Sequence, residues 1–151
     1  MNQLKKALIG AVIAFGTISL LKDQIGLVRS YTDSLPYHYF LALKKMSPQK
    51  GDYTCIDSSW HGDKVIKEIV GIPGDELLYD AAGNLWVGRR YIGKSKKKAT
   101  DGRSLTPIKP GLIPDGYVFV KGDHERSFDS RYEQLGLVAV KDLQGRLVAL
   151  A

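Results

Sequence analysis

Hydrophobic and polar positions divide the chain into an apolar N-terminal segment and a body of short, mostly alternating runs. The residues from Ala7 to Leu21 carry no charge, and they are flanked by Lys5, Lys6 and Lys22. A bilayer-spanning helix needs about 20 apolar residues, with a lower limit near 17. The run is therefore short for a span, although lysine side chains at its ends can extend it by reaching to the interface.

The same pattern of a basic start followed by an apolar centre also fits a secretory signal peptide. No clean A-x-A cleavage site follows, and Ala14-Phe15-Gly16 is a weak substitute. We favour an uncleaved transmembrane anchor over a cleaved signal peptide, and either over a buried soluble helix. The first two place the rest of the chain outside the cytoplasm, because the basic start stays inside. We therefore expect residues 1–28 to form a membrane anchor or signal peptide.

The remaining residues, 29–151, read as strands separated by turns, rich in Val, Ile and Tyr. Close hairpins are expected around Gly83-Asn84 and around Gln144-Gly145, a short helical turn at 41–46, and an irregular insertion at 94–114. The pattern predicts an all-β, mostly antiparallel domain with the N-terminal transmembrane helix outside it. The expected strands are Asp52–Ile56, Lys64–Ile72, Glu76–Tyr79, Leu85–Tyr91, Tyr117–Lys121, Leu135–Val140 and Arg146–Leu150.

The formal net charge of +6 is compatible with nucleic acid, with anionic lipid or with neither. Besides the N-terminus, positive charge gathers at Lys94 and Lys96 to Lys98. No aromatic residue interleaves this run, so stacking on bases is not indicated and no nucleic-acid partner is expected. A solvated loop is the favoured interpretation, and contact with anionic lipid or with substrate is the alternative.

The chain has a single cysteine, Cys55, which excludes an intramolecular disulfide and a cysteine-based zinc site. It lies in an expected strand and is interpreted as a packed core thiol. The histidines His38, His61 and His124 show no metal-like spacing. No metal or other cofactor is expected.

Three segments carry candidate chemistry, and each has an ordinary explanation when taken alone. A Thr-x-Ser before a proline is a common turn, a lysine on a strand can face solvent, and a segment rich in Asp, Ser and Arg can be a polar loop. The segments are Tyr31–Pro36, Lys64–Asp75 and Gly122–Tyr132.

Taken together and in this order, the segments resemble the signal peptidase I superfamily of serine-lysine peptidases, over about 120 of the 151 residues. In that family the nucleophilic serine follows the membrane anchor, and the base lysine precedes a G-[LI]-P-G-D turn. Lys67 lies four residues before Gly71-Ile72-Pro73-Gly74-Asp75, as that pattern requires. The later G-D-N box of the family is matched at Gly122, Asp123, Ser127, Asp129, Ser130 and Arg131.

The nucleophile segment resembles one branch of this superfamily more than the others. Thr32-x-Ser34-x-Pro36 is shorter by one residue than the S-M-x-P of general signal peptidases. Together with the small size, it resembles the TraF-type peptidases of bacterial conjugation, which process pilin precursors and in some cases cyclise them. The chain departs from the family pattern at His124, at Glu68 and at Tyr37-His38, which leaves substrate and pocket shape open.

The chemistry explains why a lysine is needed beside the serine. A serine hydroxyl is a weak nucleophile without a neighbouring base, and no histidine stands in a recognisable triad order. The ordinary pKa of lysine, ~10.4, must fall by ~3 units, which burial away from carboxylates can achieve. Alternation places Lys67 between Val65 and Ile69 on one strand face and Glu68 on the other. Lys64 is the rival base, but its register to the turn is wrong.

The resemblance also implies roles for the remaining site residues. Ser34 would be the nucleophile and Lys67 its general base, with Ser127 hydrogen-bonded to the neutral amine. Asp129 and Arg131 would form a supporting ion pair. The Thr32 hydroxyl and the Ser34 backbone N–H would form the oxyanion hole.

These residues favour a serine endopeptidase anchored in the bacterial inner membrane, with its catalytic domain facing the periplasm. Its partners would be inner-membrane lipid and a peptide or pilin precursor, which it cleaves with or without cyclisation of the product. The alternative is a general type I signal peptidase that removes signal peptides from secreted preproteins. A non-enzymatic assembly factor on the same fold and a LexA-like self-cleaving regulator are less favoured. The first conflicts with intact Ser34, Lys67 and Ser127, and the second needs no apolar segment.

Overall fold

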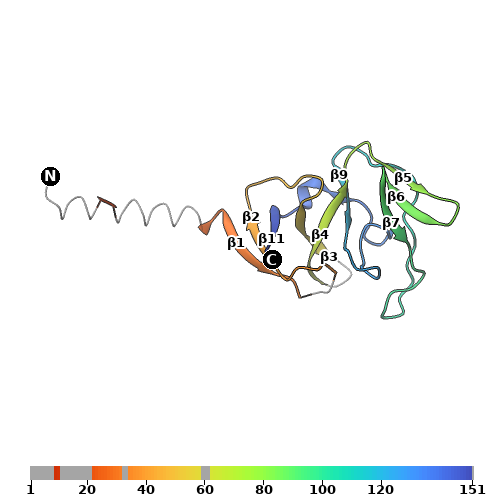
Figure 1. Ribbon diagram of the computed structural model, residues 1–151, viewed down its shortest axis with the longest axis horizontal. Helices are drawn as coiled ribbons and strands as arrows, with labels where there is room; N and C mark the ends of the chain where they lie inside the picture. Colours follow the sequence, from red (N-terminus) through yellow and green to blue (C-terminus); the bar gives the residue numbers. More distant parts are fainter. Residues whose placement is uncertain (1–8, 11–21, 32–33, 59–61, 151) are drawn as a thin grey trace.

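The computed structural model describes residues 9–10, 22–31, 34–58 and 62–150, and folds this part of the chain mainly into two antiparallel sheets (Figure 1). The larger sheet has the strand order β1-β2-β11-β3-β4-β9-β10 and the smaller one the order β7-β6-β5-β8. The mostly antiparallel β architecture expected from the sequence is thus confirmed. The larger sheet contains β1 (Ile25–Arg29), β2 (Tyr39–Leu43), β3 (Tyr53–Ser58), β4 (Asp63–Gly71), β9 (Tyr117–Lys121), β10 (Val138–Ala139) and β11 (Arg146–Leu150). The smaller sheet contains β5 (Glu76–Tyr79), β6 (Asn84–Val87), β7 (Arg90–Lys94) and β8 (Gly111–Leu112), and a short 3-10 helix, η1, spans Val140–Asp142.

Strand β4 is central because both of its faces are covered by apolar side chains. Val65 and Ile69 pack with Ile56, Val118 and Val120 on one side. On the other side, Ile66 joins a second cluster that contains Leu35, Phe40, Cys55 and Leu147. A strand buried on both faces has little access to water, so any polar side chain on it must find a partner inside the protein.

The smaller sheet packs its own apolar side chains against the end of β4 and against β9. Val70 of β4 and Phe119 of β9 share a cluster with Leu77, Leu85 and Val87. In Figure 1 this sheet lies at the end of the domain opposite to β1. The segment 122–132, described below, follows β9 directly, and it therefore lies beside the junction of the two sheets.

Several expected elements are confirmed, and three have their expected bounds. Glu76–Tyr79, Tyr117–Lys121 and Arg146–Leu150 are strands as expected, and Lys64–Ile72 corresponds to β4 with a shift of one residue. The hairpin at Gly83-Asn84 joins β5 to β6. Cys55 is buried in β3, as expected for a core thiol.

Four expectations about local structure were wrong. The run Leu85–Tyr91 is two strands, β6 and β7, because Gly88, with φ of 56°, turns the chain back on itself. Residues 41–46 are not a helical turn, since β2 pairs with both β1 and β11. Leu135–Val140 is a strand only over β10, and Gln144-Gly145 does not close a hairpin, because β10 pairs with β9 while β11 pairs with β2 and β3.

The expected membrane helix lies mostly outside the described residues, which include only Ile9 and Gly10 of the apolar segment. Within the described part of the chain, no helix has the length and apolar character to cross a bilayer. Strand β1 begins at Ile25, inside the 1–28 segment, and pairs with β2 over its full length. The boundary between anchor and domain stays a prediction.

Candidate active site

Lys67 is one of the most deeply buried polar residues of the larger sheet, with a relative exposure of 1%. It lies in the middle of β4, where β3 pairs with it on one side and β9 pairs further along on the other. Its Nζ donates a hydrogen bond of 2.7 Å to Oγ of Ser127. Since no carboxylate forms an ion pair with Lys67 among the described residues, this neutral hydroxyl is the partner that holds the amine.

Burial lowers the pKa of Lys67 from 10.5 to about 8, because the charged form loses its hydration. The negative charge of Asp129 opposes this change, and the positive charge of Arg131 supports it. A lysine with a pKa near 8 is neutral in about one molecule in ten at pH 7. Such an amine can accept a proton at neutral pH, which an ordinary lysine cannot.

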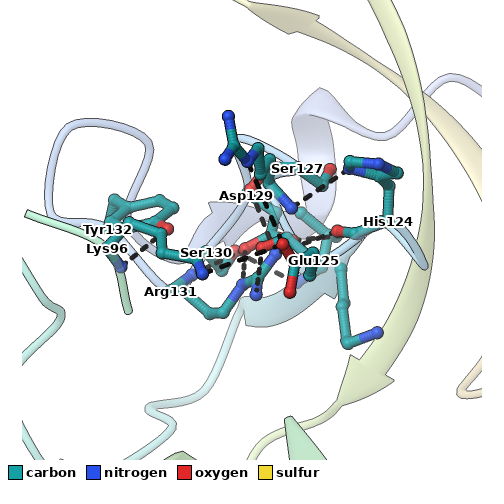
Figure 2. Close-up of polar contacts among 12 residues, drawn as sticks. Lys96, His124, Glu125, Ser127, Asp129, Ser130, Arg131 and Tyr132 are labelled. Atoms are coloured by element: carbon teal, nitrogen blue, oxygen red, sulfur yellow. Dashed lines mark hydrogen bonds and ion pairs between the residues drawn. The ribbon is translucent and has the colours of Figure 1, made fainter. Parts of the chain in front are cut away.

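Ser127 is positioned by the segment that follows β9, and its neighbours are shown in Figure 2. Oδ2 of Asp129 accepts a hydrogen bond from the Gly122 backbone at 3.0 Å, and Oδ1 accepts one from the Arg131 backbone at 3.1 Å. Ser130 Oγ accepts from the Val120 backbone at 3.0 Å. These bonds close the loop between Gly122 and Asp129 and tie its far end to Val120 of β9, and so they fix the position of Ser127.

Arg131 is buried inside the same loop and organises it from within (Figure 2). Its guanidinium donates to both oxygens of Asp129, at 2.8 and 2.9 Å. The remaining donors reach the backbone carbonyls of Glu125, Ser127 and, at 3.4 Å, His124. Because these five hydrogen bonds reach acceptors on several sides of the rigid guanidinium, the arginine acts as a scaffold for the loop around it.

Gly122 approaches the candidate base so closely that no side chain fits there. A Cβ built on this glycine would meet Ser127, with the Ser127 Cβ at 2.7 Å, and would lie 3.1 Å from Lys67 Nζ. The sequence analysis noted Gly122 only as part of a motif. The structure gives its physical reason: the backbone at Gly122, just after β9, passes directly over the Lys67–Ser127 pair.

Ser34 is held beside this loop by contacts on either side of it. Its carbonyl accepts a hydrogen bond of 3.1 Å from the backbone N–H of His124. The next residue, Leu35, is buried in the cluster that contains Ile66, the neighbour of Lys67 on β4. Ser34 itself is half-buried. Thr32, the expected oxyanion donor, lies outside the described residues.

Glu68 and Lys64, two further ionisable residues of β4, bind elsewhere, as the strand alternation indicated. Both oxygens of Glu68 accept hydrogen bonds from Arg90 of β7, at 2.6 and 2.8 Å, which links the two sheets. The Lys64 side chain is exposed and donates to Gln144 at 2.7 Å. Arg90 was not singled out from the sequence, although the unusual acid after Lys67 was. Among the described residues, no group of His, Cys, Asp or Glu is placed to hold a metal ion.

Comparison with known proteins assigns the chain to a family. The model of the family described as "Signal peptidase, peptidase S26" matches residues 1–151. The chain belongs to this family. It is 33% identical over 106 residues to a signal peptidase I of Bacillus licheniformis, which covers 64% of this chain and 55% of that one.

Two further relatives are a conjugal transfer protein and another signal peptidase. The conjugal transfer protein TraF of Agrobacterium fabrum is 30% identical over 70 residues, which covers 45% of this chain and 39% of TraF. A probable signal peptidase I-2 of Synechocystis is 34% identical over 85 residues, covering 56% and 36%. The alignments thus span about half or less of these relatives. A crystal structure of a signal peptidase I from Enterococcus faecalis matches with a TM-score of 0.44 and 25% identity, covering 67% of this chain and 97% of that one.

Proposed function

We propose that this member of the signal peptidase family is a serine endopeptidase in which Ser34 is the nucleophile and Lys67 the general base. The observation that carries the proposal is the buried Lys67 amine, whose pKa is lowered to about 8 and which is hydrogen-bonded to Ser127. A neutral amine takes the hydroxyl proton of Ser34 as its oxygen attacks the scissile carbonyl. The protonated lysine then returns the proton to the leaving amine, and an acyl-enzyme forms on Ser34.

The supporting residues take the roles that the geometry allows. Ser127 positions the amine, while Asp129 and Arg131 hold the loop that carries Ser127. The Ser34 backbone N–H and the Thr32 hydroxyl are proposed as the donors that stabilise the oxyanion. Deacylation uses water, or a peptide amine when the product is cyclised.

We further propose that residues 1–28 anchor the peptidase domain, 29–151, in the bacterial inner membrane with the catalytic residues facing the periplasm. The support is the uncharged run from Ala7 to Leu21 between basic residues. This orientation brings Ser34 close to the membrane, because only about a dozen residues separate it from the end of that run. A precursor that is itself membrane-borne is then the substrate within reach.

The favoured substrate is a conjugative pilin precursor. The T-x-S-x-P segment at Thr32–Pro36 and the similarity to a conjugal transfer protein support it. The alternative, a general signal peptidase acting on secreted preproteins, is supported by the relatives that carry this name. Co-expression with a pilin precursor, set against complementation of cells depleted of signal peptidase, separates the two.

The peptidase proposal is tested with Ser34→Ala and Lys67→Ala in the full chain. Each variant is expected to lose cleavage of a co-expressed precursor, measured by mass spectrometry of the mature N-terminus. Ser47→Ala, which changes an exposed serine, is the matched control and keeps activity. Thermal melting shows whether the variants remain folded. Cleavage that persists in folded Ser34→Ala or Lys67→Ala would remove the proposal.

A further inference from the structure

A cleft of about 490 Å³ lies between the smaller sheet and the segment that carries Ser127. Strands β6 and β7 form one wall with Asn84 and Tyr91, and the other wall comes from the end of β9 and the loop after it. Three lysines line it: Lys94 from the end of β7, Lys96 from the following loop, and Lys121 from β9. Part of the lysine run at 94–98 thus faces a cleft, and the proposed peptidase mechanism gives it no role.

The lysine-bearing loop is fixed against the catalytic segment. The backbone N–H of Lys96 donates to the Tyr132 hydroxyl at 3.2 Å, and Figure 2 shows this contact beside Arg131. Further along, the Ile108 N–H bonds to the Arg131 carbonyl and the Glu133 N–H to that of Thr106. Since these bonds hold the loop at both ends, the wall that the loop contributes to the cleft is fixed in position.

The ammonium groups in the cleft are only loosely paired. Lys96 lies 3.8 Å from Glu125, and Lys121 lies 3.9 Å from Asp123, well beyond the 2.7–2.9 Å of a charge-assisted hydrogen bond. Lys94 has no ion-pair partner among the described residues. The Lys121 side chain is 14% exposed, so it has lost much of its hydration without gaining a close acceptor. Such groups keep donors available for an anion that enters.

The cleft also adjoins the candidate catalytic residues. Lys121 and Asp123 flank Gly122, whose backbone passes over Lys67 and Ser127. Both charged residues act on the pKa of Lys67, Asp123 raising it and Lys121 lowering it. A peptide bound at Ser34 therefore has a stretch of its chain within reach of this cleft.

We propose that the cleft is a substrate subsite that binds one acidic side chain of the polypeptide being cleaved, through Lys94, Lys96 and Lys121. The inference rests on the proposed peptidase function and adds to it a charge preference. The Glu or Asp carboxylate enters between the three ammonium groups. Asn84 and Tyr91, on the opposite wall, bound the space that it occupies.

The charge balance favours a single carboxylate over a lipid surface. The three lysines face the carboxylates of Asp123 and Glu125, while Arg131 is matched by buried Asp129. The cleft thus carries about one net positive charge. Attraction to anionic lipid amounts to about 1 kcal/mol for each basic residue at the surface, so a cleft of this charge contributes little to membrane binding. One acidic side chain, by contrast, matches this net charge.

The test uses quenched-fluorescence peptides with an Ala-Gln-Ala cleavage sequence, in which one Glu or one Gln is placed in turn at each flanking position. With the full chain in detergent, we expect Glu to lower KM roughly three- to fivefold relative to Gln at one position or two adjacent ones, with kcat unchanged. Lys94→Gln with Lys96→Gln should abolish this difference. The matched control is Lys97→Gln with Lys98→Gln, which removes two exposed lysines of the same loop and should retain it.

The outcomes separate this subsite from the peptidase function itself. Cleavage without a Glu preference at any position overturns the subsite and leaves the peptidase proposal intact. The same holds if both double variants, Lys94→Gln with Lys96→Gln and Lys97→Gln with Lys98→Gln, lose the Glu preference equally. Binding of the same peptides to the Ser34→Ala chain, followed by fluorescence anisotropy, keeps the subsite testable without cleavage. If activity in vesicles with and without phosphatidylglycerol depends on Lys94 and Lys96 while no Glu preference exists, the cleft contacts lipid and the proposal is wrong.

Discussion

Lys67 and Ser127 lie 60 residues apart in the sequence, yet the Lys67 Nζ is 2.7 Å from the Ser127 Oγ inside the protein. The amine is 1% exposed and has a hydroxyl, not a carboxylate, as its close partner. A carboxylate at that distance would stabilise the ammonium form and raise the pKa. The hydroxyl accepts a hydrogen bond and leaves the pKa low, so the pair holds a base that is ready for use near neutral pH.

Peptidase activity should therefore rise with pH as Lys67 loses its proton. Because the neutral amine is the proposed base, kcat/KM is expected to reach half of its maximum near pH 8 and to level off above it. Initial rates with a fluorogenic peptide, from well below to well above pH 8, measure this limb. A half-point near ~6.5, the ordinary pKa of histidine, would instead indicate a histidine base.

The stability of the domain should depend on the same group, in a direction fixed by its lowered pKa. At pH values below about 8 the folded protein must bury a charged lysine or release its proton, which costs roughly 3 kcal/mol relative to the unfolded chain. The cost fades as pH rises from about 8 to 10.5, where the unfolded chain also loses the proton.

Lys67→Met removes this cost, although it also loses the hydrogen bond to Ser127, worth about 1 kcal/mol. We expect the variant to be inactive and about 2 kcal/mol more stable at pH 7, as measured by urea unfolding followed by circular dichroism. The gain should disappear above pH 10.5. Equal stability of the two proteins at pH 7 and at high pH would contradict the burial cost assigned to Lys67.

Gly122→Ala should strongly reduce activity because the added methyl group collides with Ser127, the residue that holds the proposed base Lys67. Its Cβ would lie 2.7 Å from the Ser127 Cβ and 3.1 Å from Lys67 Nζ, so Ser127 or the backbone at Gly122 must move. A misplacement of about 1 Å at a reacting group costs on the order of 100-fold in kcat. The loss of stability should be about 1–3 kcal/mol, as for an overpacked core.

Gly26→Ala is the matched control for this glycine. Its Cβ would meet only the flexible side chain of Lys44, at 3.4 Å, and the Ala42 Cβ, at 3.9 Å. Activity close to that of the unchanged chain is expected. Should Gly122→Ala retain full kcat, the close approach at Gly122 would have no bearing on catalysis.

Local patterns predicted much of the site because its parts are set by strand alternation and short motifs. The alternation along β4 separated Lys67 from Glu68, and the structure indeed pairs Glu68 with Arg90. The alternation could not identify Arg90 as the partner of Glu68, since the sequence pattern predicts β6 and β7 as one longer strand. Neither could any local pattern show that Gly122 passes over Lys67, because that contact needs β4 and β9 to be paired.

The parts of the fold that were missed are those decided by distant partners. Tyr39–Leu43 is a short apolar run, and such runs fit a helix or a strand equally well until pairing is known. Its strand form depends on β11, the last strand of the chain, which enters between β2 and β3. For the same reason the turn at Gln144-Gly145 was recognised, but its strands were joined to the wrong neighbours.

Arg131→Met should destabilise the segment that carries Ser127, and it also removes a positive charge that helps to keep the pKa of Lys67 low. The substitution leaves Asp129 as a buried, unpaired carboxylate and frees the carbonyls of Glu125 and Ser127. Breaking a buried ion pair in this way typically costs about 3–5 kcal/mol. Thermal melting should show a loss of this size, accompanied by loss of peptide cleavage.

Lys109→Met, which removes an exposed ion pair with Glu133 at 3.6 Å, should cost less than about 1 kcal/mol and keep activity. If both variants lost the same small amount of stability, the loop would be held by its backbone bonds, and Arg131 would not be the scaffold that positions Ser127.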